Sequence, residues 1–287
     1  MERVVSLSEK YINEVVTSAL AEDLGQGDVT TDALIPAGLQ GRASFVSKAS
    51  GIVAGLEVSR AVFLHVDSAL QVTGLFSDGA RIKPGDVLGH VSGATVSILK
   101  AERTALNFLQ RMSGIATETS RYVEAVAGLS ARITDTRKTT PGLRLLEKYA
   151  VRAGGGVNHR LNLGDMVLIK DNHIAALRAK GMTLRDIILQ AKRRSPPGMK
   201  VEVEVTIAEE AAEAATAGAD TVMLDNMGVE DMRRAVKLVK GKILIEASGG
   251  ITLDNVRSVA ETGVDYISVG ALTHSVRALD ISLEMEG

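Results

Sequence analysis

Cationic side chains and glycines are concentrated between Asp135 and His173. Besides the run Gly154-Gly155-Gly156, this basic segment contains four Arg, three Lys and two His: Arg137, Arg144, Arg152, Arg160, Lys138, Lys148, Lys170, His159 and His173. Guanidinium groups bind carboxylates and phosphates through two hydrogen bonds at once, and glycine lets a backbone approach a ligand closely. The segment therefore predicts a site for a small molecule that carries several negative charges.

The chain as a whole is slightly acidic. Its 287 residues carry a net charge of -2, and 45% of them are hydrophobic, enough for one large core or two unequal ones. Such a charge gives no general attraction to nucleic acid or to anionic membranes, and an aromatic content of 3% argues against a surface that stacks bases. We expect neither kind of partner.

The chain contains no Cys, which excludes disulfides, thiolate catalysis and Cys-ligated metals. No apolar run approaches the roughly 20 residues of a membrane span. Near the N-terminus, Glu9, Lys10 and Glu14 interrupt the apolar core that a signal peptide would need. We therefore expect a cytoplasmic protein.

The first part of the chain predicts a small α+β domain. Apolar residues from Ser8 to Leu20 follow helical spacing behind a Ser8 cap. Residues 41–96 form short β-rich runs separated by Gly, Pro and Asp, typical of an antiparallel or mixed sheet, with one helix near 56–65.

A helical period then runs from Ser97 to Met112, is interrupted at Ser113-Gly114 and resumes to Ala127. We place the domain boundary at this interruption. Residues 1–112 form the N-terminal domain, joined by the C-terminal segment 273–287, and residues 113–272 form the second domain.

In the second domain, short apolar strands alternate with helices such as Ile207–Ala217, Val229–Val239 and Leu253–Thr262. The six predicted strands are ARITDT, DMVLIKD, KVEVEVT, TVMLDN, KILIEASGG and YISVGAL. Parallel strands need crossover helices, and strands this apolar must be covered on both faces. The pattern predicts an α/β fold, a (β/α) barrel with parallel strands, beside the smaller α+β domain.

Polar residues stand at or near the C-terminal ends of these six strands. They are Lys170-Asp171-Asn172, Glu202, Glu204, Asp225-Asn226, Glu246, Ser248-Gly249-Gly250 and Gly270. Active sites of (β/α) barrels are built at that rim, so we expect the site there. The turns at Ser248-Gly249-Gly250 and at Gly270 could place backbone N–H groups around a phosphate, although tight βα turns alone would also explain them.

A series of motifs spans nearly the whole chain and resembles quinolinate phosphoribosyltransferases. It consists of EDLGQGDVTT, AERTALNFLQRMSGIAT, TDTRKTTPGLR, GGGVNHR, LIKDNH, VEVEV, MLDN, EASGGI and VGALTHS. The resemblance implies transfer of the phosphoribosyl group of 5-phosphoribosyl-1-pyrophosphate to quinolinate with decarboxylation. The products would be nicotinate mononucleotide, pyrophosphate and CO₂, in the de novo synthesis of NAD.

The resemblance also assigns residues to quinolinate, a ring with two carboxylates. It implies that this acceptor is held by Arg137, Lys138, His159 and Arg160. Lys170 is expected in the same pocket for anionic ligands, and Arg103 is expected to enter it from a second subunit. The resemblance therefore implies a homodimer, which could assemble further. Lys138 is also expected to be catalytic.

For the donor, the resemblance implies Mg²⁺ and the carboxylates of Glu204 and Asp225 beside the ribose. These two residues are expected to be catalytic and to hold the metal directly or through water. Glu202 and Glu204 share one face of a strand, so the strand period does not separate them. Glu204 is chosen for its place nearer the strand end and its spacing from Asp225. Ser248, Gly249, Gly250 and Gly270 would surround the 5-phosphate.

Several charged residues admit structural explanations. Arg144, Lys148 and Arg152 fit a solvated helix face, and His173 fits a cap or a loop brace. His65 fits packing on an apolar helix, and His274 either shapes the phosphate site or makes a structural hydrogen bond.

Three other functions remain open at this point. A lysine at a strand end, as Lys170 is, also suits a Schiff-base aldolase, provided that its surroundings depress its pKa. The chain could belong to the related molybdenum-transport-associated branch of the fold, or it could sense a phosphate ligand without turnover. The carboxylates Glu204 and Asp225 favour an enzyme, because binding alone would not require them beside phosphates.

Overall fold

The computed structural model describes residues 6–239 and 241–286, which divide into two compact units. The first unit contains the residues up to Ser120, the segment Thr139–Gly155 and the residues from Ala271 on. The second contains Arg121–Lys138 and Gly156–Gly270. This grouping differs from the expected division into residues 1–112 with 273–287 and residues 113–272, because the segment Thr139–Gly155 also belongs to the first unit.

The first unit is built on an antiparallel sheet with the strand order β12-β1-β5-β3. β1 (Gln40–Ser47) pairs with β5 (Val87–Ala94) and with β12 (Ile281–Met285), and β3 (Gln71–Gly74) pairs with β5. A second small sheet pairs β2 (Gly51–Ile52) with β4 (Arg81–Ile82). The antiparallel sheet predicted for this region is confirmed.

Most helices of this unit bury an apolar face in its core, whereas α2 (Val29–Leu34) leaves Val29 and Leu34 exposed. The helices of this unit are α1 (Glu9–Leu24), α2, α3 (Leu56–Val66), most of α4 (Thr95–Ala125), α5 (Arg144–Ala153) and α11 (Ala271–His274). The predicted cap of α1 is confirmed, since the Ser8 side chain accepts the N–H of Tyr11. The helix expected near 56–65 is α3.

The helix interruption predicted at Ser113-Gly114 is wrong, because α4 runs unbroken through both residues. Ser113 is buried, and its hydroxyl accepts the N–H of Ala54 at 3.0 Å. A Cβ on Gly114 would lie 2.1 Å from the carbonyl oxygen of Arg277. Both small residues therefore let other backbone segments approach the helix closely; neither ends it.

The expectation of a solvated face on α5 is wrong for Lys148, whose side chain is fully buried. Arg144 and Arg152 are partly exposed. The neighbouring Glu147 is also buried and accepts hydrogen bonds from the Arg111 guanidinium and from the N–H of Thr140. Charged side chains can be buried in this way only where other polar groups accompany them, and the helical period of the sequence does not reveal such partners.

The second unit contains a six-stranded parallel sheet with the order β6-β11-β10-β9-β8-β7. Its strands coincide with the six predicted ones: β6 (Arg132–Thr134), β7 (Val167–Ile169), β8 (Val201–Val205), β9 (Thr221–Asp225), β10 (Leu244–Ser248) and β11 (Tyr266–Ser268). The predicted fold class is confirmed: the chain contains parallel strands with helices and, in addition, a smaller domain with an antiparallel sheet.

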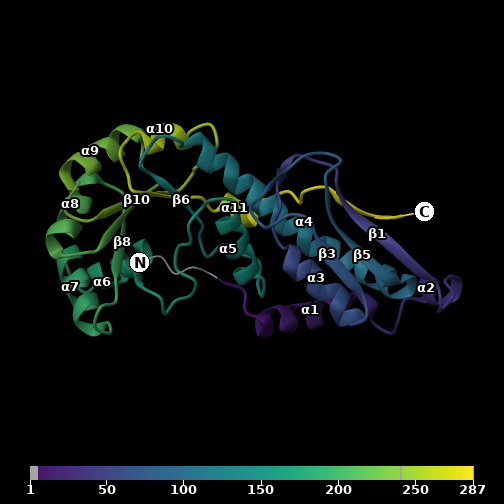
Figure 1. The fold of residues 1–287 in the computed structure, drawn as a ribbon. Helices are drawn as coiled ribbons and strands as arrows, with labels where there is room; N and C mark the ends of the chain where they lie inside the picture. The colour runs from purple at the N-terminus through teal and green to yellow at the C-terminus, as the bar shows by residue number, and fades with distance from the viewer. Residues whose placement is uncertain (1–5, 240, 287) are drawn as a thin grey trace. The chain divides into compact units, whose positions relative to one another are not determined.

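Helices cover the outer side of this sheet, with α7 to α10 following one another along it (Figure 1). They are α6 (Asp171–Arg178), α7 (Leu184–Arg194), α8 (Ala208–Ala217), α9 (Val229–Val239) and α10 (Val256–Ala260). α10 is shorter than the predicted helix Leu253–Thr262, because the Asn255 side chain binds the carbonyl of Gly250 and the N–H of Thr252 and so fixes a turn before it.

The parallel sheet is strongly curved. The His159 side chain, which follows the segment paired with β6, reaches carboxylates on both β8 and β10. Neighbouring strands lie about 4.8 Å apart, so a flat sheet would separate β6 from β8 by about 19 Å. The strands therefore wrap around an interior, as in an open barrel.

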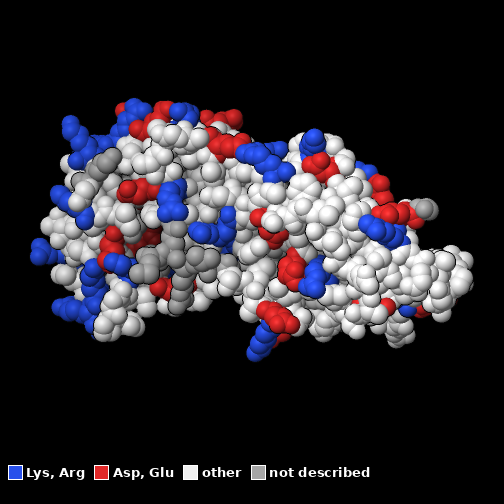
Figure 2. All heavy atoms as spheres, in the orientation of Figure 1, with Lys and Arg blue, Asp and Glu red and all other residues white. Residues whose placement is uncertain are grey.

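Among the described residues, no helix is both long enough and apolar enough to cross a membrane. On the face drawn in Figure 2, Lys and Arg are interspersed with Asp and Glu, as expected for a net charge of -2.

Candidate active site

Nearly all predicted site residues lie in the second unit, at or just after the carboxyl ends of its strands. Arg137 and Lys138 follow β6, Lys170 follows β7, and Gly270 follows β11; Glu204, Asp225 and Ser248 belong to the ends of β8, β9 and β10. Because parallel strands end at the same edge of a sheet, these residues share one rim. Arg103 is the exception, since it is an exposed residue of α4 in the first unit.

Two cation-bearing segments are tied together by Asp135, which is fully buried. One carboxylate oxygen of Asp135 accepts the side-chain amide of Asn158 at 2.6 Å, and the other accepts the backbone N–H of His159 at 2.9 Å. Val157 also pairs in parallel with Thr134. The segment that carries Arg160 therefore runs beside the one that carries Arg137.

Arg160 is held among other charged groups. Burial lowers its pKa, and so does the positive charge of Arg137, while Glu202 and Asp165 act in the opposite direction. Two positive charges that lie near each other are stabilised when an anion enters between them. The pair Arg137 and Arg160 is therefore a candidate receptor for a ligand with more than one carboxylate.

Lys170 and Glu204 form an ion pair, with Nζ and Oε2 separated by 3.0 Å. Lys170 is about half exposed, whereas the side chain of Glu204 is 11% exposed. Because the Lys170 side of this pair is open to solvent, Lys170 can exchange Glu204 for a ligand group. A Schiff-base lysine is activated by an apolar or cation-crowded setting, whereas Lys170 is paired with the Glu204 carboxylate, so this geometry does not favour an aldolase.

His173 acts as a structural residue of the neighbouring turn. Its Nδ1 accepts the backbone N–H of Lys170 at 2.9 Å, at the start of α6. The capping explanation given for this histidine is confirmed.

The ends of β9 and β10 interlock through Asn226 and Gly249. Asn226 has a φ of 53°; its backbone N–H donates to the carbonyl of Ser248 at 2.9 Å, and its side-chain amide donates to Asp225 at 2.6 Å. A Cβ on Gly249 would lie 2.3 Å from Oδ1 of Asn226. Glycine is thus required at 249 for the Asp225 carboxylate to keep its position.

The turn after β10 is open on one side. Gly250 has a φ of 62°, and a Cβ placed on it would meet no atom within 4 Å. Its carbonyl accepts the side-chain amide of Asn255 at 2.9 Å. Ser248, Gly249 and Gly250 therefore present a fixed backbone beside free space, as a phosphate-binding turn would need.

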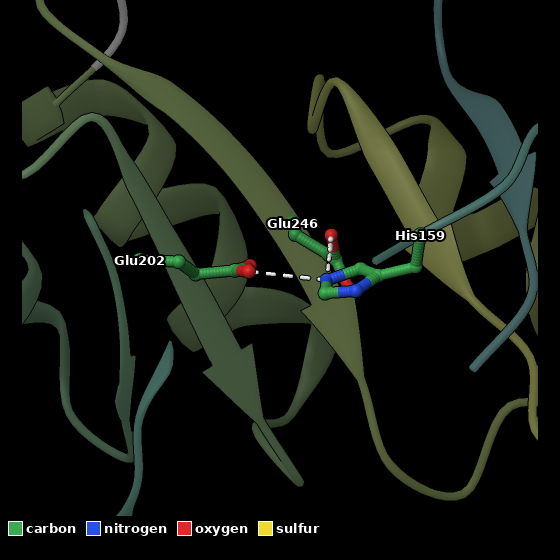
Figure 3. Close-up of side chains that lie close together, drawn as sticks. All are labelled: His159, Glu202 and Glu246. Carbon is green, nitrogen blue, oxygen red and sulfur yellow. Dashed lines mark hydrogen bonds and ion pairs between the residues drawn. The ribbon is translucent and has the colours of Figure 1, made fainter. Parts of the chain in front are cut away.

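A buried cluster of His159, Glu202 and Glu246 lies inside the curved sheet. Glu202 and Glu246 point inward from β8 and β10 toward the His159 ring (Figure 3). Nε2 of His159 lies 3.0 Å from Oε2 of Glu202 and 3.5 Å from Oε2 of Glu246. Burial, reinforced by the negative charge of Glu202, raises the pKa of Glu246 to about 8.

The sequence showed these two glutamates at strand positions but did not predict their buried contacts with His159. It also did not predict that Asp135 binds the segment of Asn158 and His159. One signal was available. Each carboxylate occurs within an otherwise apolar strand, in VEVEV and in LIEAS, where a buried charge requires a partner.

The site can bind an anion with several charges and hold carboxylates beside it. Cations come from the segments after β6 and β7, carboxylates from β8 and β9, and an open glycine turn from the end of β10. This distribution suits a reaction in which positive charge develops on one part of a substrate and negative charge on a leaving group.

Comparison with known proteins gives matches along the chain. Residues 28–113 match the family described as quinolinate phosphoribosyl transferase, N-terminal domain, and residues 115–284 match the C-terminal domain of the same family. A nicotinate-nucleotide pyrophosphorylase (carboxylating) of Mycobacterium leprae is 45% identical over 281 residues, covering 95% of this chain and 96% of that protein. A quinolinate phosphoribosyltransferase (decarboxylating) 2, mitochondrial, of Nicotiana glauca is 44% identical over 291 residues, covering 96% and 82%.

Solved structures agree with these matches. The nicotinate-nucleotide pyrophosphorylase from Francisella tularensis has a TM-score of 0.93 and 37% identity, and the alignment covers 100% of both chains. NadC from Streptococcus pyogenes has a TM-score of 0.92 and 42% identity, with 99% of this chain and 98% of that chain covered.

Proposed function

The chain belongs to the quinolinate phosphoribosyltransferase family, and we propose that the charged residues at the carboxyl ends of its parallel strands carry out that family's reaction. The enzyme transfers the phosphoribosyl group of 5-phosphoribosyl-1-pyrophosphate to quinolinate. One carboxylate leaves as CO₂, and the products are nicotinate mononucleotide and pyrophosphate. This is a step in the biosynthesis of NAD.

The acceptor is bound by Arg137, Lys138, Arg160 and Lys170. The observation that carries this assignment is that the segments bearing Arg137 and Arg160 run side by side, joined through Asp135 and through the pairing of Thr134 with Val157. Quinolinate has two carboxylates on adjacent ring atoms, and two planar guanidinium groups can each bind one of them in a bidentate manner. His159 belongs to the same wall of the site.

The donor is bound by the carboxylates of Glu204 and Asp225 on neighbouring strands. Positive charge develops on the ribose carbon as pyrophosphate leaves, and a carboxylate beside the ribose stabilises that charge. In this proposal Lys138 and Lys170 also stabilise the opposite charge that develops on the leaving group.

The carboxylates of Glu204 and Asp225 are hard oxygen donors, both partly exposed, which fits Mg²⁺ held directly or through water. When bound, Mg²⁺ would neutralise charge on the pyrophosphate. Backbone groups of Ser248, Gly249, Gly250 and Gly270 bind the 5-phosphate of the ribose. The open space beside Gly250 supports this assignment.

The enzyme acts as a homodimer in this proposal, and Arg103 enters the site of the partner subunit. The support for this part of the proposal is that Arg103 is exposed on α4 in the first unit, whereas the candidate site lies in the second unit.

A cytoplasmic location completes the proposal, because a chain without Cys suits a reducing compartment. The Nicotiana glauca relative is named mitochondrial. Cell fractionation tests this part, and recovery of the protein within an organelle would contradict it.

The function is tested with purified protein, phosphoribosyl pyrophosphate and Mg²⁺. Quinolinate should give nicotinate mononucleotide and CO₂, whereas nicotinate should give no product. Failure with both acceptors from a folded protein that binds the donor would overturn the assignment.

The site residues are tested in the same assay. Arg160→Ala should weaken quinolinate use about 10- to 100-fold, the effect of losing a hydrogen bond to a charged group. The matched control is Arg178→Ala, which removes a surface ion pair with Glu210 and should change quinolinate use less than about twofold. Equal losses in the two variants would contradict the assignment of Arg160.

A further inference from the structure

The His159 ring is enclosed by protein groups on both sides. Nε2 lies 3.0 Å from Oε2 of Glu202, and Nδ1 accepts the backbone N–H of Arg160 at 2.8 Å. Since Nδ1 accepts a hydrogen bond, it carries no proton, and the proton of the ring must be on Nε2. Both ring nitrogens are therefore used inside the protein, and neither is left for a substrate carboxylate.

A metal ion does not explain this cluster, although the ligand atoms of His159, Glu202 and Glu246 all lie within 4.8 Å of one another. A metal would bind Nε2 through its lone pair, and Nδ1 would then carry the proton and donate it. The N–H of Arg160 points at Nδ1 instead. The ring that carries its proton on Nε2 satisfies both contacts: Nε2–H donates to Glu202, and Nδ1 accepts the N–H of Arg160.

The two glutamates stand in fixed positions on buried strand residues. Glu202 is 1% exposed and Glu246 is 3% exposed. One oxygen of Glu246 accepts the hydroxyl of Ser268 on β11, so the cluster joins β8, β10 and β11. Burial raises the pKa of Glu246 to about 8, and a protonated Glu246 adds no second negative charge beside Glu202.

His159 links the buried glutamates Glu202 and Glu246 to the proposed acceptor site. The backbone N–H of His159 is bound by Asp135, two residues before Arg137, and the backbone N–H of Arg160 is bound by the His159 ring. The ring therefore connects the strand interior to the backbone of the segment that carries Arg160.

We propose that Glu202, Glu246 and His159 are positioning residues, which hold Arg137 and Arg160 at the spacing that a ligand with two adjacent carboxylates requires. The proposal rests on the proposed function and refines it in one respect. His159 acts on quinolinate through Arg160 and does not bind it.

The first test reads the His159 ring directly, by NMR of protein labelled with ¹⁵N in its five histidines; the His159→Asn spectrum identifies the signal. The expected state is an Nε2–H ring with an unprotonated Nδ1, and saturating quinolinate or Zn²⁺ should leave that state unchanged. A ring protonated on both nitrogens, or one whose tautomer changes with quinolinate or Zn²⁺, would overturn the proposal. The unliganded spectrum needs no turnover, so its result is independent of the activity assay.

The second test is a double-mutant cycle on quinolinate affinity with His159→Asn and Glu202→Gln. Each single variant should weaken quinolinate binding about tenfold. The double variant should bind quinolinate no more weakly than the single variant with the lower affinity, because both substitutions break the same hydrogen bond between His159 and Glu202. Losses that multiply in the double variant would show that His159 binds quinolinate independently of Glu202. Glu230→Gln, at an exposed helix position paired with Arg233, is the control and should bind quinolinate as the wild type does.

Discussion

Glu246 is a carboxyl group whose surroundings favour its protonated form. Its pKa rises from 4.5 to about 8, first because the group is buried and second because Glu202 is negatively charged, and Asp135 adds to the shift; His159 and Ser268 oppose it. In the unfolded chain the same group loses its proton near pH 4 to 5. Between these pH values the folded protein holds a proton that the unfolded chain does not.

The free energy of unfolding should therefore decrease as pH rises from about 5 to 8, by at most about 1.4 kcal/mol per pH unit from this one group. Below that range the contribution of Glu246 is complete, and above it the contribution is lost. Urea denaturation at several pH values measures the slope. Glu246→Gln, which stays neutral at every pH, should flatten the slope over this range, whereas the exposed control Glu230→Gln should keep it. Identical slopes in all three proteins would contradict the raised pKa.

Gly249 and Gly250 are adjacent residues with positive φ but different surroundings. Gly249→Ala would place a methyl group 2.3 Å from the Asn226 side chain, while Gly250→Ala would meet no atom within 4 Å. Strained backbone alone costs each variant about 1 to 3 kcal/mol. We expect Gly249→Ala to lose more stability and, because Asn226 holds Asp225, to bind phosphoribosyl pyrophosphate much more weakly. Calorimetric titration of both variants is the measurement, and a larger loss of binding in Gly250→Ala would refute the explanation.

At the scale of elements, Gly114 in α4 is kept by a close contact, although glycine has a low helix propensity. In an exposed helix, Gly→Ala stabilises by about 1 kcal/mol. At Gly114 the added methyl group would lie 2.1 Å from the carbonyl oxygen of Arg277, so Gly114→Ala should lower the melting temperature. Gly38→Ala, where no atom lies within 4 Å of the new Cβ, is the control and should change it little. A melting temperature that rises in Gly114→Ala would show that propensity outweighs the contact.

The same glycine shows where prediction from sequence succeeds and where it fails. All six strands of the parallel sheet were predicted, because their apolar runs are bounded by polar residues and turns. The continuity of α4 through Gly114 was not predicted, because the reason for a glycine at this position is the close carbonyl of Arg277, a residue far along the chain. Burial of Lys148 was missed as well, because the helical period of α5 does not show which of its charged residues face the core.

For the site, the sequence predicted that cations and carboxylates lie at the strand ends. It did not predict that Glu202 contacts His159 while Glu204 contacts Lys170. Both Glu202 and Glu204 lie on one face of β8, two residues apart. Their difference comes from curvature of the sheet, which encloses Glu202 beside His159 and leaves Glu204 near Lys170. No period in the sequence encodes that curvature.

For the whole molecule, the proposed sharing of Arg103 between subunits predicts complementation. Arg103→Ala and Lys138→Ala should each be nearly inactive alone. After unfolding and refolding together, they should regain about a quarter of wild-type activity, because half of randomly paired dimers are mixed and each mixed dimer has one site with neither substitution. Activity that never exceeds that of the separate variants, in a mixture shown to contain mixed dimers, would contradict the shared site.

The pairing of β12 with β1 has a consequence for the synthesis of the chain. Arg42 and Glu286, which hydrogen-bond across these strands, are 244 positions apart. A ribosome releases the chain from its N-terminus onward, so β1 leaves the exit tunnel long before its edge partner exists. Until β12 has been synthesised, that edge is an exposed template for strands of other chains. Nascent chains stalled before β12 should therefore require a chaperone, or aggregate, even though the parallel sheet is already complete.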